Sequence, residues 1–211
     1  MTAALIGTGG IGSAIGRLLA AGGETVRLAS ADPELARTLA ATIGPTATVA
    51  ADNHEAIQGA DAVVLALRFG VLEGVLGEIA DGLVDQVVVV PSNPVGLDAG
   101  GGVVRLLPEG ESSGEVVGRW VPEHAHLALA FGTMSADLLE ASSRRSPDPA
   151  VLFYAADDDR AGREVERLIR VAGFEPMKIG GLEQSGRLEV GGDLHDVVVG
   201  PAEARSRIAG G

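Results

Sequence analysis

A glycine-rich segment near the start of the chain carries the clearest chemical signal. Residues 7–12 read Gly-Thr-Gly-Gly-Ile-Gly and directly follow the apolar run 3–6. Glycines with this spacing, between a strand and a helix, are typical of a turn that holds the pyrophosphate of a dinucleotide. The backbone can then approach the phosphates closely, and the amides at the start of the helix face them. The residues expected to contact the cofactor here are Gly7, Thr8, Gly9, Gly10 and Ile11.

The choice between NAD and NADP depends on the residues after the second expected strand, 25–29. An NAD site usually has an acidic residue there for the ribose hydroxyls, and here Ser30 and then Asp32 follow the strand. Because Pro33 comes next, Asp32 also fits the capping residue of a helix. Arg68 ends another apolar run, where it would suit the 2′-phosphate of NADP. Alternatively, Arg68 is an ordinary exposed arginine on the surface. The pattern alone leaves both cofactors open.

Apolar runs alternate with helix signals along most of the chain. The continuous apolar segments 62–67 and 87–90 are typical of buried parallel strands. Their alternation with amphipathic segments predicts right-handed βαβ units and an α/β fold with a Rossmann-type, doubly wound parallel sheet. Strands are expected at 3–6, 25–29, 46–50, 62–67, 87–90, 127–131, 151–155 and 174–179, with helices at 10–21, 33–44, 53–58, 71–79, 112–121, 134–141 and 160–172.

The alternation lapses in a glycine-rich stretch, residues 96–111, where we expect a loop. This lapse predicts a boundary near Gly100. The first part, residues 1–100, would bind the dinucleotide, and a smaller α/β part, residues 101–211, would serve the substrate and dimerisation. The tail after Gly180 holds glycine pairs and a weak apolar segment, from which we expect a homodimer.

Composition and charge limit the classes of function. The 211 residues are 46% apolar, which is enough for a sizeable core. A formal net charge of −13 opposes binding to nucleic acid or to anionic membranes. The chain has no cysteine, so it has no disulfide and no cysteine-ligated metal. Without a membrane-length apolar run or a signal-peptide pattern, we expect a cytoplasmic enzyme of small molecules that holds no metal.

Two other groups of residues could carry chemistry, but each also has a structural explanation. His126 could donate a proton to a substrate, and with His124 it could begin a metal site, although no further ligands complete one. The string Gly-Glu-Ser-Ser-Gly at 110–114 matches a serine hydrolase motif, but a turn and not a strand precedes it. We therefore interpret Ser112 or Ser113 as the N-cap of a helix.

Six segments carry a family signal: residues 4–12, 90–95, 130–133, 152–159, 172–176 and 180–183. Together they resemble the NADP oxidoreductases that use the deazaflavin coenzyme F420. The resemblance implies a cofactor NADP(H) and a second substrate stacked on the nicotinamide near the Ser-Asn-Pro segment. In that family an arginine is expected after the serine that follows the second strand. This chain has Ser30-Ala31, so we expect only a modest preference for NADP(H).

Residues at the carboxyl ends of the strands are expected to complete the site, because ligands of a doubly wound sheet gather there. Besides the glycine-rich turn, those expected to bind the cofactor are Ser30, Leu67, Arg68, Asn93 and Pro94. Those expected to form the pocket for the second substrate are Val95, Phe131, Gly132 and Thr133.

The expected activity is hydride transfer between NADP(H) and coenzyme F420. Transfer between two stacked rings needs positioning more than acid–base chemistry, because the cofactors carry the reactive atoms. One alternative is an NADPH-dependent reductase of a small carbonyl or imine metabolite, with His126 as the proton donor. A second alternative is a sensor that binds NAD(P) and has no catalytic activity.

Overall fold

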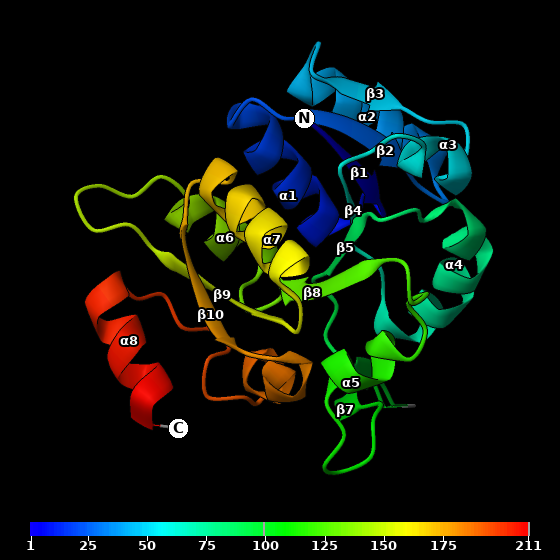
Figure 1. Ribbon diagram of the computed structural model, residues 1–211. Coiled ribbons are helices and arrows are strands. Elements are labelled where there is room, and N and C mark those ends of the chain that lie inside the picture. Colours follow the sequence, from blue (N-terminus) through cyan, green and yellow to red (C-terminus); the bar gives the residue numbers. More distant parts are fainter. Residues whose placement is uncertain (99, 211) are drawn as a thin grey trace.

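A single eight-stranded sheet forms the centre of the molecule (Figure 1). The computed structural model describes residues 1–98 and 100–210. The strands lie in the order β10-β9-β8-β5-β4-β1-β2-β3. Their bounds are β1 Thr2–Ile6, β2 Thr25–Ala29, β3 Ala47–Val49, β4 Ala62–Leu65, β5 Val87–Val90, β8 His126–Ala130, β9 Val151–Ala156 and β10 Glu175–Gly180; a separate hairpin contains β6 Val95–Leu97 and β7 Val103–Arg105.

The strand order confirms the expected Rossmann-type, doubly wound sheet. From β1 the chain proceeds through β2 and β3 in one direction, and from β4 through β5 in the other. Ligands of such sheets lie at the carboxyl ends of the strands, beside the point where the order reverses. The glycine-rich turn follows β1 and Leu67 follows β4, so both lie at this point. Residues before 100 supply five strands of the sheet, and β8 extends it by pairing with β5.

One strand breaks the expected parallel pattern, because β9 runs antiparallel to β8. The helix between them, α6 (Ala136–Ser142), packs along α1 (Gly10–Ala21). Strand β9 then begins beyond the carboxyl end of β8, with Ala130 paired to Tyr154, so the chain has not returned to the amino end of β8. Such a return is what a parallel neighbour requires.

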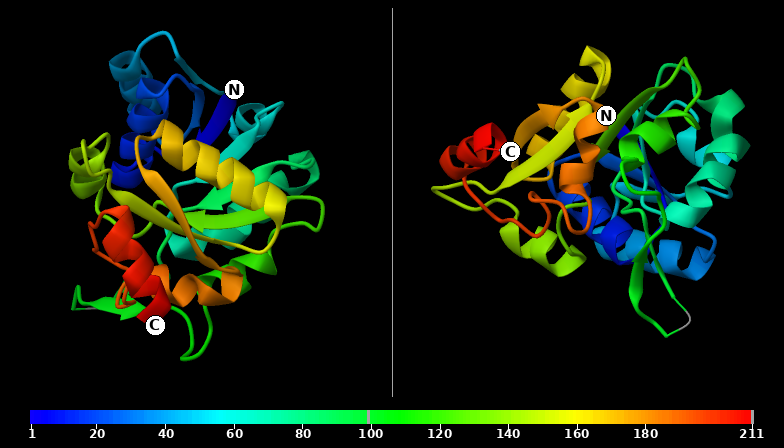
Figure 2. Two further views of the ribbon diagram at one scale, coloured as in Figure 1. Left: turned by 60° about the vertical axis from the view of Figure 1, so that its left-hand side comes forward. Right: turned by 90° about the horizontal axis from the view of Figure 1, so that it is seen from below.

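Helices cover both faces of the sheet, as Figure 2 shows. Alternate residues of β1 face opposite layers: Ala3 and Leu5 pack with α1, α2, α6 and α7, whereas Ala4 and Ile6 pack with α3, α4 and α5. None of the described helices is long and apolar enough to cross a membrane. The remaining bounds are α2 Pro33–Ile43, α3 Asn53–Ile57, α4 Leu72–Ile79, α5 Ser113–Gly118, α7 Asp159–Val171, α8 Pro201–Gly210, and the 3-10 segments η1 Phe69–Val71, η2 Ala80–Gly82 and η3 Leu182–Leu188.

The structure confirms two predicted helix caps, and it contains a hairpin and a C-terminal helix that were not expected. Asp32 accepts the amides of Glu34 and Leu35 at the start of α2, and Ser112 caps α5. Within the expected loop 96–111, β6 and β7 form a hairpin, whose strands of three residues are too short to show a periodicity. Helix α8 was also missed, because only Ala204 of it is buried and no apolar stripe marks it.

Candidate cofactor and substrate site

The glycines of the turn after β1 have separable roles. Gly7 has a left-handed backbone, with φ of 98°. A Cβ atom on Gly7 would collide with the carbonyl oxygen of Ala66, and one on Gly12 would collide with that of Gly7. A Cβ on Gly9 would meet no atom of the described residues within 4 Å. Gly7 and Gly12 are therefore required by the fold, whereas Gly9 borders open space above the turn.

The start of α1 offers unpaired donors beside this open space. No side chain of the described residues caps α1, and its first turn contains no acidic residue. The hydroxyl of Thr8, a residue only 4% exposed, has no hydrogen-bond partner among the described residues. Buried hydroxyls are normally hydrogen-bonded, and helix N-termini attract anions. The turn therefore fits the pyrophosphate of a dinucleotide.

A groove of about 400 Å³ lies at the carboxyl ends of β2 and β3 and is lined partly by Ser30 and Arg37. Ala36 and Val49 give it apolar walls that suit an adenine ring. The side chain of Arg37 is 58% exposed and pairs with Glu34 on the same helix. Arg68, which was expected near the 2′-phosphate, follows β4 on the other side of β1 and does not line this groove.

The ends of β4, β5 and β8 are tied together by side chains of the Ser-Asn-Pro segment. The hydroxyl of Ser92 donates to the carbonyl of Leu67 at 2.5 Å. The Nδ2 atom of Asn93 donates to the carbonyl of Gly132 at 2.8 Å. A Cβ atom on Gly132 would collide with the carbonyl of Pro91, so this approach requires glycine. These contacts form a wall beside the glycine-rich turn, and the sequence placed Leu67, Asn93 and Gly132 there.

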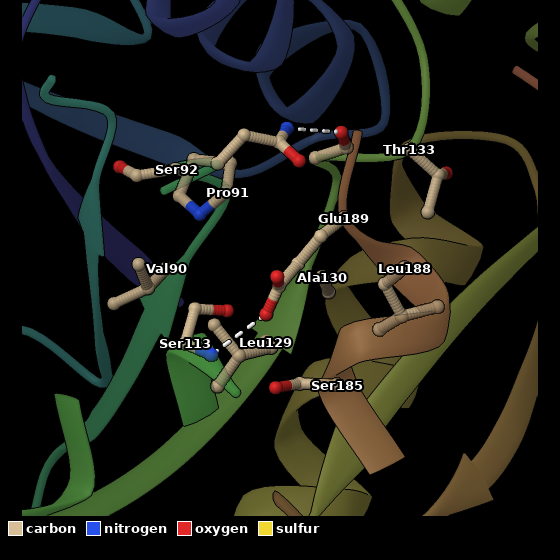
Figure 3. Close-up of a pocket in the computed structure, with 12 residues that line it drawn as sticks. Val90, Pro91, Ser92, Ser113, Leu129, Ala130, Thr133, Ser185, Leu188 and Glu189 are labelled. Atoms are coloured by element: carbon tan, nitrogen blue, oxygen red, sulfur yellow. Dashed lines mark hydrogen bonds between the residues drawn. The ribbon is translucent and has the colours of Figure 1, made fainter. Parts of the chain in front are cut away.

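Behind this wall is a cavity of about 20 Å³, which Figure 3 shows with its lining side chains. It has room for about one water molecule, so it takes a water molecule or a polar substituent of a ligand, and not a ring. Thr133 lines the cavity and is 1% exposed. Its hydroxyl has no hydrogen-bond partner among the described residues. Thr133 therefore offers a free polar group at the position that was predicted for the second substrate.

The structure removes Phe131 from the predicted pocket. Its ring is fully buried in the core layer that contains α1, α6 and α7, and it does not line the cavity. Its φ of 66° is left-handed and turns the side chain inward where β8 ends. Pro94 is buried, and Val95 begins β6, so the chain leaves the wall at these residues.

His126 lies at the opposite edge of the sheet from the glycine-rich turn. It is the first residue of β8, whereas Gly132 and Thr133 follow the last. Its ring nitrogens lie 3.0 Å from a carboxylate oxygen of Asp85 and 3.1 Å from one of Asp158. The described residues contain no group of three or more acidic or histidine side chains that could hold a metal ion. The candidate proton donor therefore lies beside two carboxylates, at the end of the sheet opposite the glycine-rich turn.

This placement gives the first prediction. We expect His126→Ala to lower kcat by less than about tenfold, well below the 10²–10⁴ that follows the loss of a general acid. Steady-state oxidation of NADPH by the variant measures this. A loss of about a hundredfold or more in a folded variant would contradict the placement of the reaction at the carboxyl edge.

Residues 182–196, which we call the cover, close the site from one side. The sequence did not reveal this. The amide of Val190 donates to Oδ1 of Asn93 at 2.8 Å, and that of Asp196 donates to the carbonyl of Thr133 at 2.8 Å. Arg187 donates to Asp193 and holds the pKa of that carboxyl below its usual range. The cover has little apolar periodicity, and long-range backbone contacts leave no signal in the sequence.

This arrangement is that of a Rossmann-type dinucleotide-binding oxidoreductase. It combines an open glycine-rich turn, a wall beside that turn, and the unpartnered hydroxyls of Thr8 and Thr133. The chain is 31% identical over 194 residues to the F420-dependent NADP reductase of Methanothermobacter thermautotrophicus, covering 87% of this chain and 82% of that protein. It belongs to the family described as NADP oxidoreductase, coenzyme F420-dependent, whose model matches residues 2–94. It is an NADP-dependent oxidoreductase.

Two solved structures share the fold over most of their length. A hypothetical protein from Sinorhizobium meliloti superimposes with a TM-score of 0.82 and 28% identity, covering 95% of each chain. A putative F420-dependent NADP reductase from Arthrobacter gives a TM-score of 0.73 and 22% identity, covering 86% of this chain and 85% of that one. The fold of most of the chain, including much of the part beyond the family match, is therefore shared with these proteins.

Proposed function

We propose that this enzyme transfers a hydride between NADP(H) and a deazaflavin of the coenzyme F420 type. The observation that carries the proposal is the wall formed by Asn93, Gly132 and Thr133 next to a turn that fits a pyrophosphate. Family membership supports the choice of NADP(H) and of a deazaflavin as partners. When bound, the two cofactors supply and accept the hydride, and one proton is exchanged with the solvent.

The residues of the chain bind and orient the two partners. The uncapped start of α1 and the hydroxyl of Thr8 hold the pyrophosphate. The groove beside β2 takes the adenosine, which places the nicotinamide toward Asn93 at the wall. Thr133 offers its hydroxyl to a polar group of the bound rings. Fixing both rings removes most of the entropic part of the barrier.

The alternative of a carbonyl or imine reductase needs a proton donor at the wall. Among the described residues that line the cavity there is no histidine, lysine or tyrosine. The one carboxylate there, Glu189, faces hydrogen-bond donors. These observations favour direct transfer between stacked rings over a reaction with general-acid catalysis.

Absorbance assays separate the proposed function from its alternatives. NADPH consumption is measured with coenzyme F420, with a panel of cyclic imines and with small ketones and aldehydes, each at the same enzyme concentration. We expect turnover with coenzyme F420 and none above background with the others. Turnover with imines or carbonyls alone supports the reductase alternative, and NADPH binding without any turnover supports the sensor.

We also propose that Arg37 contacts the 2′-phosphate and provides the preference for NADP(H). Arg37 lines the groove with Ser30, and its pair with Glu34 is exposed and therefore weak. A guanidinium can leave such a pair for a phosphate, to which its hydrogen bonds are stronger. This assignment replaces Arg68 as the source of the positive charge.

The second prediction tests this assignment by titration calorimetry. We expect Arg37→Gln to raise the Kd for NADPH about tenfold, the low end for a charge-assisted hydrogen bond, and to leave the Kd for NADH unchanged. Arg163→Gln is the matched control, because it removes the same charge from an exposed position on α7. Equal weakening of both cofactors by Arg37→Gln would reject the phosphate contact.

A further inference from the structure

Glu189 is a buried acidic residue at the site that the hydride transfer does not use. It is 3% exposed and lines the cavity behind the wall. One carboxylate oxygen accepts the amide of Ser113 at 2.6 Å, as Figure 3 shows, and the other accepts the guanidinium of Arg105 at 2.5 Å. Because both oxygens face donors, the group is arranged to accept hydrogen bonds and not to deliver a proton.

The partners of Glu189 come from elements that are distant in the sequence. Arg105 ends β7, Ser113 begins α5, and Glu189 itself follows η3 within the cover. A carboxylate removed from water is costly unless it is paired and hydrogen-bonded. The two contacts offset that cost only while the hairpin, α5 and the cover stay in place. One carboxylate therefore joins these three segments.

The segments that Glu189 joins are connected to the wall at Asn93, one through the cover and one through the hairpin. On the cover, the residue after Glu189 donates its amide to Oδ1 of Asn93, while Nδ2 of Asn93 holds the carbonyl of Gly132. On the hairpin, Arg105 is the register partner of Val95, two residues beyond Asn93. The position and orientation of the Asn93 carboxamide therefore depend on where Glu189 holds both segments.

We propose that Glu189 is a positioning residue whose carboxylate, held by Arg105 and Ser113, fixes the wall of Asn93 and Gly132 against which the two rings stack. The inference rests on the proposed hydride transfer. The transfer requires the donor and acceptor atoms at a near-attack distance, and a small displacement lowers the rate strongly. NADP(H) itself is held mainly by the glycine-rich turn and the adenosine groove, so its affinity does not depend on Glu189.

The test compares Glu189→Gln and Arg105→Gln with the wild-type enzyme. Glutamine keeps the shape and an acceptor for the Ser113 amide, but it removes the charge pair. We expect kcat per NADPH-binding site to fall about tenfold or more, with the Kd for NADPH unchanged within about twofold. The isotope effect with NADPH deuterated at the transferred position increases, because hydride transfer becomes fully rate-limiting.

Two further variants make the comparison specific. The double variant Glu189→Gln/Arg105→Gln is expected to be no slower than the slower single variant, because the two residues act as one unit. Glu73→Gln removes a charge from an exposed residue of α4, away from the cover, and is expected to leave kcat unchanged. An unchanged kcat per site in Glu189→Gln, or a parallel loss of NADPH affinity, would overturn the proposal. If Glu189→Gln does not fold, the same measurements on Arg105→Gln test the proposal, because Arg105 is partly exposed.

Hydrogen exchange separates this inference from the proposed function. With NADP⁺ bound, Glu189→Gln is expected to accelerate amide exchange in residues 113–118 and 185–196 and to leave residues 10–21 unchanged. If the wild-type protein transfers no hydride to coenzyme F420, the proposed function fails, and the exchange measurement alone decides on Glu189. Unchanged exchange in both segments would show that Glu189 does not hold the wall.

Discussion

Gly9→Val is expected to abolish NADP(H) binding in a protein that remains folded. The backbone of Gly9 has φ of −69° and ψ of −169°, which valine adopts without strain. The new Cβ atom meets none of the described residues within 4 Å, and the side chain extends into the space above the turn that we assign to the pyrophosphate. Loss of two hydrogen bonds to a charged group, at about 1.5–3 kcal/mol each, weakens binding by at least about a hundredfold. Titration with NADPH and NADH measures this.

Two other glycines of the same turn provide matched controls for Gly9→Val. In Gly10→Ala the new Cβ lies 3.8 Å from the Cβ of Ala136, an ordinary contact on the side of α6, so both folding and binding should be retained. In Gly12→Ala the Cβ collides with the carbonyl of Gly7, so we expect a marked loss of stability. If folded Gly9→Val binds NADPH with unchanged affinity, the glycine-rich turn is not the pyrophosphate site.

The sequence predicted the first half of the molecule well because its signals there are local. The glycines at 7–12 and the cap at Asp32 each act on neighbours within a few residues, and the structure has both as expected. The apolar run that became β4 was equally clear. From these elements the reversal of strand order follows, and with it the edge of the sheet where ligands lie.

The parts that the sequence did not predict depend on contacts between distant segments. The direction of β9 depends on where the segment between β8 and β9 places the chain, and the residues of the strand itself do not specify it. His126 was a candidate because histidine suits proton transfer, but its role depends on which end of β8 it occupies. Glu189 was missed because its partners lie 84 and 76 residues away in the chain.

Thr133→Val is expected to lower activity and raise stability together. The hydroxyl of Thr133 is buried and has no partner among the described residues, so replacing it with a methyl group of the same size removes a desolvation cost. We expect the Tm to rise by a few degrees, since about 1 kcal/mol shifts a domain of this size by roughly 2–4 °C. The bound rings lose their hydrogen bond at this position and keep a buried polar group without a partner. That loss costs about 1–3 kcal/mol, so kcat/KM falls by up to about a hundredfold.

The opposite signs of the two effects distinguish a ligand-binding hydroxyl from one with a structural role. If the Thr133 hydroxyl stabilised the fold, Thr133→Val would lower both the Tm and the activity. Thr133→Ser is the matched control: it keeps the hydroxyl and removes a methyl group from the core, so we expect nearly full kcat/KM and a lower Tm. Wild-type kcat/KM in Thr133→Val would show that the hydroxyl faces no reacting partner. The second ring would then lie elsewhere on the carboxyl edge, and Asn93 would be left as the polar side chain of the wall beside it.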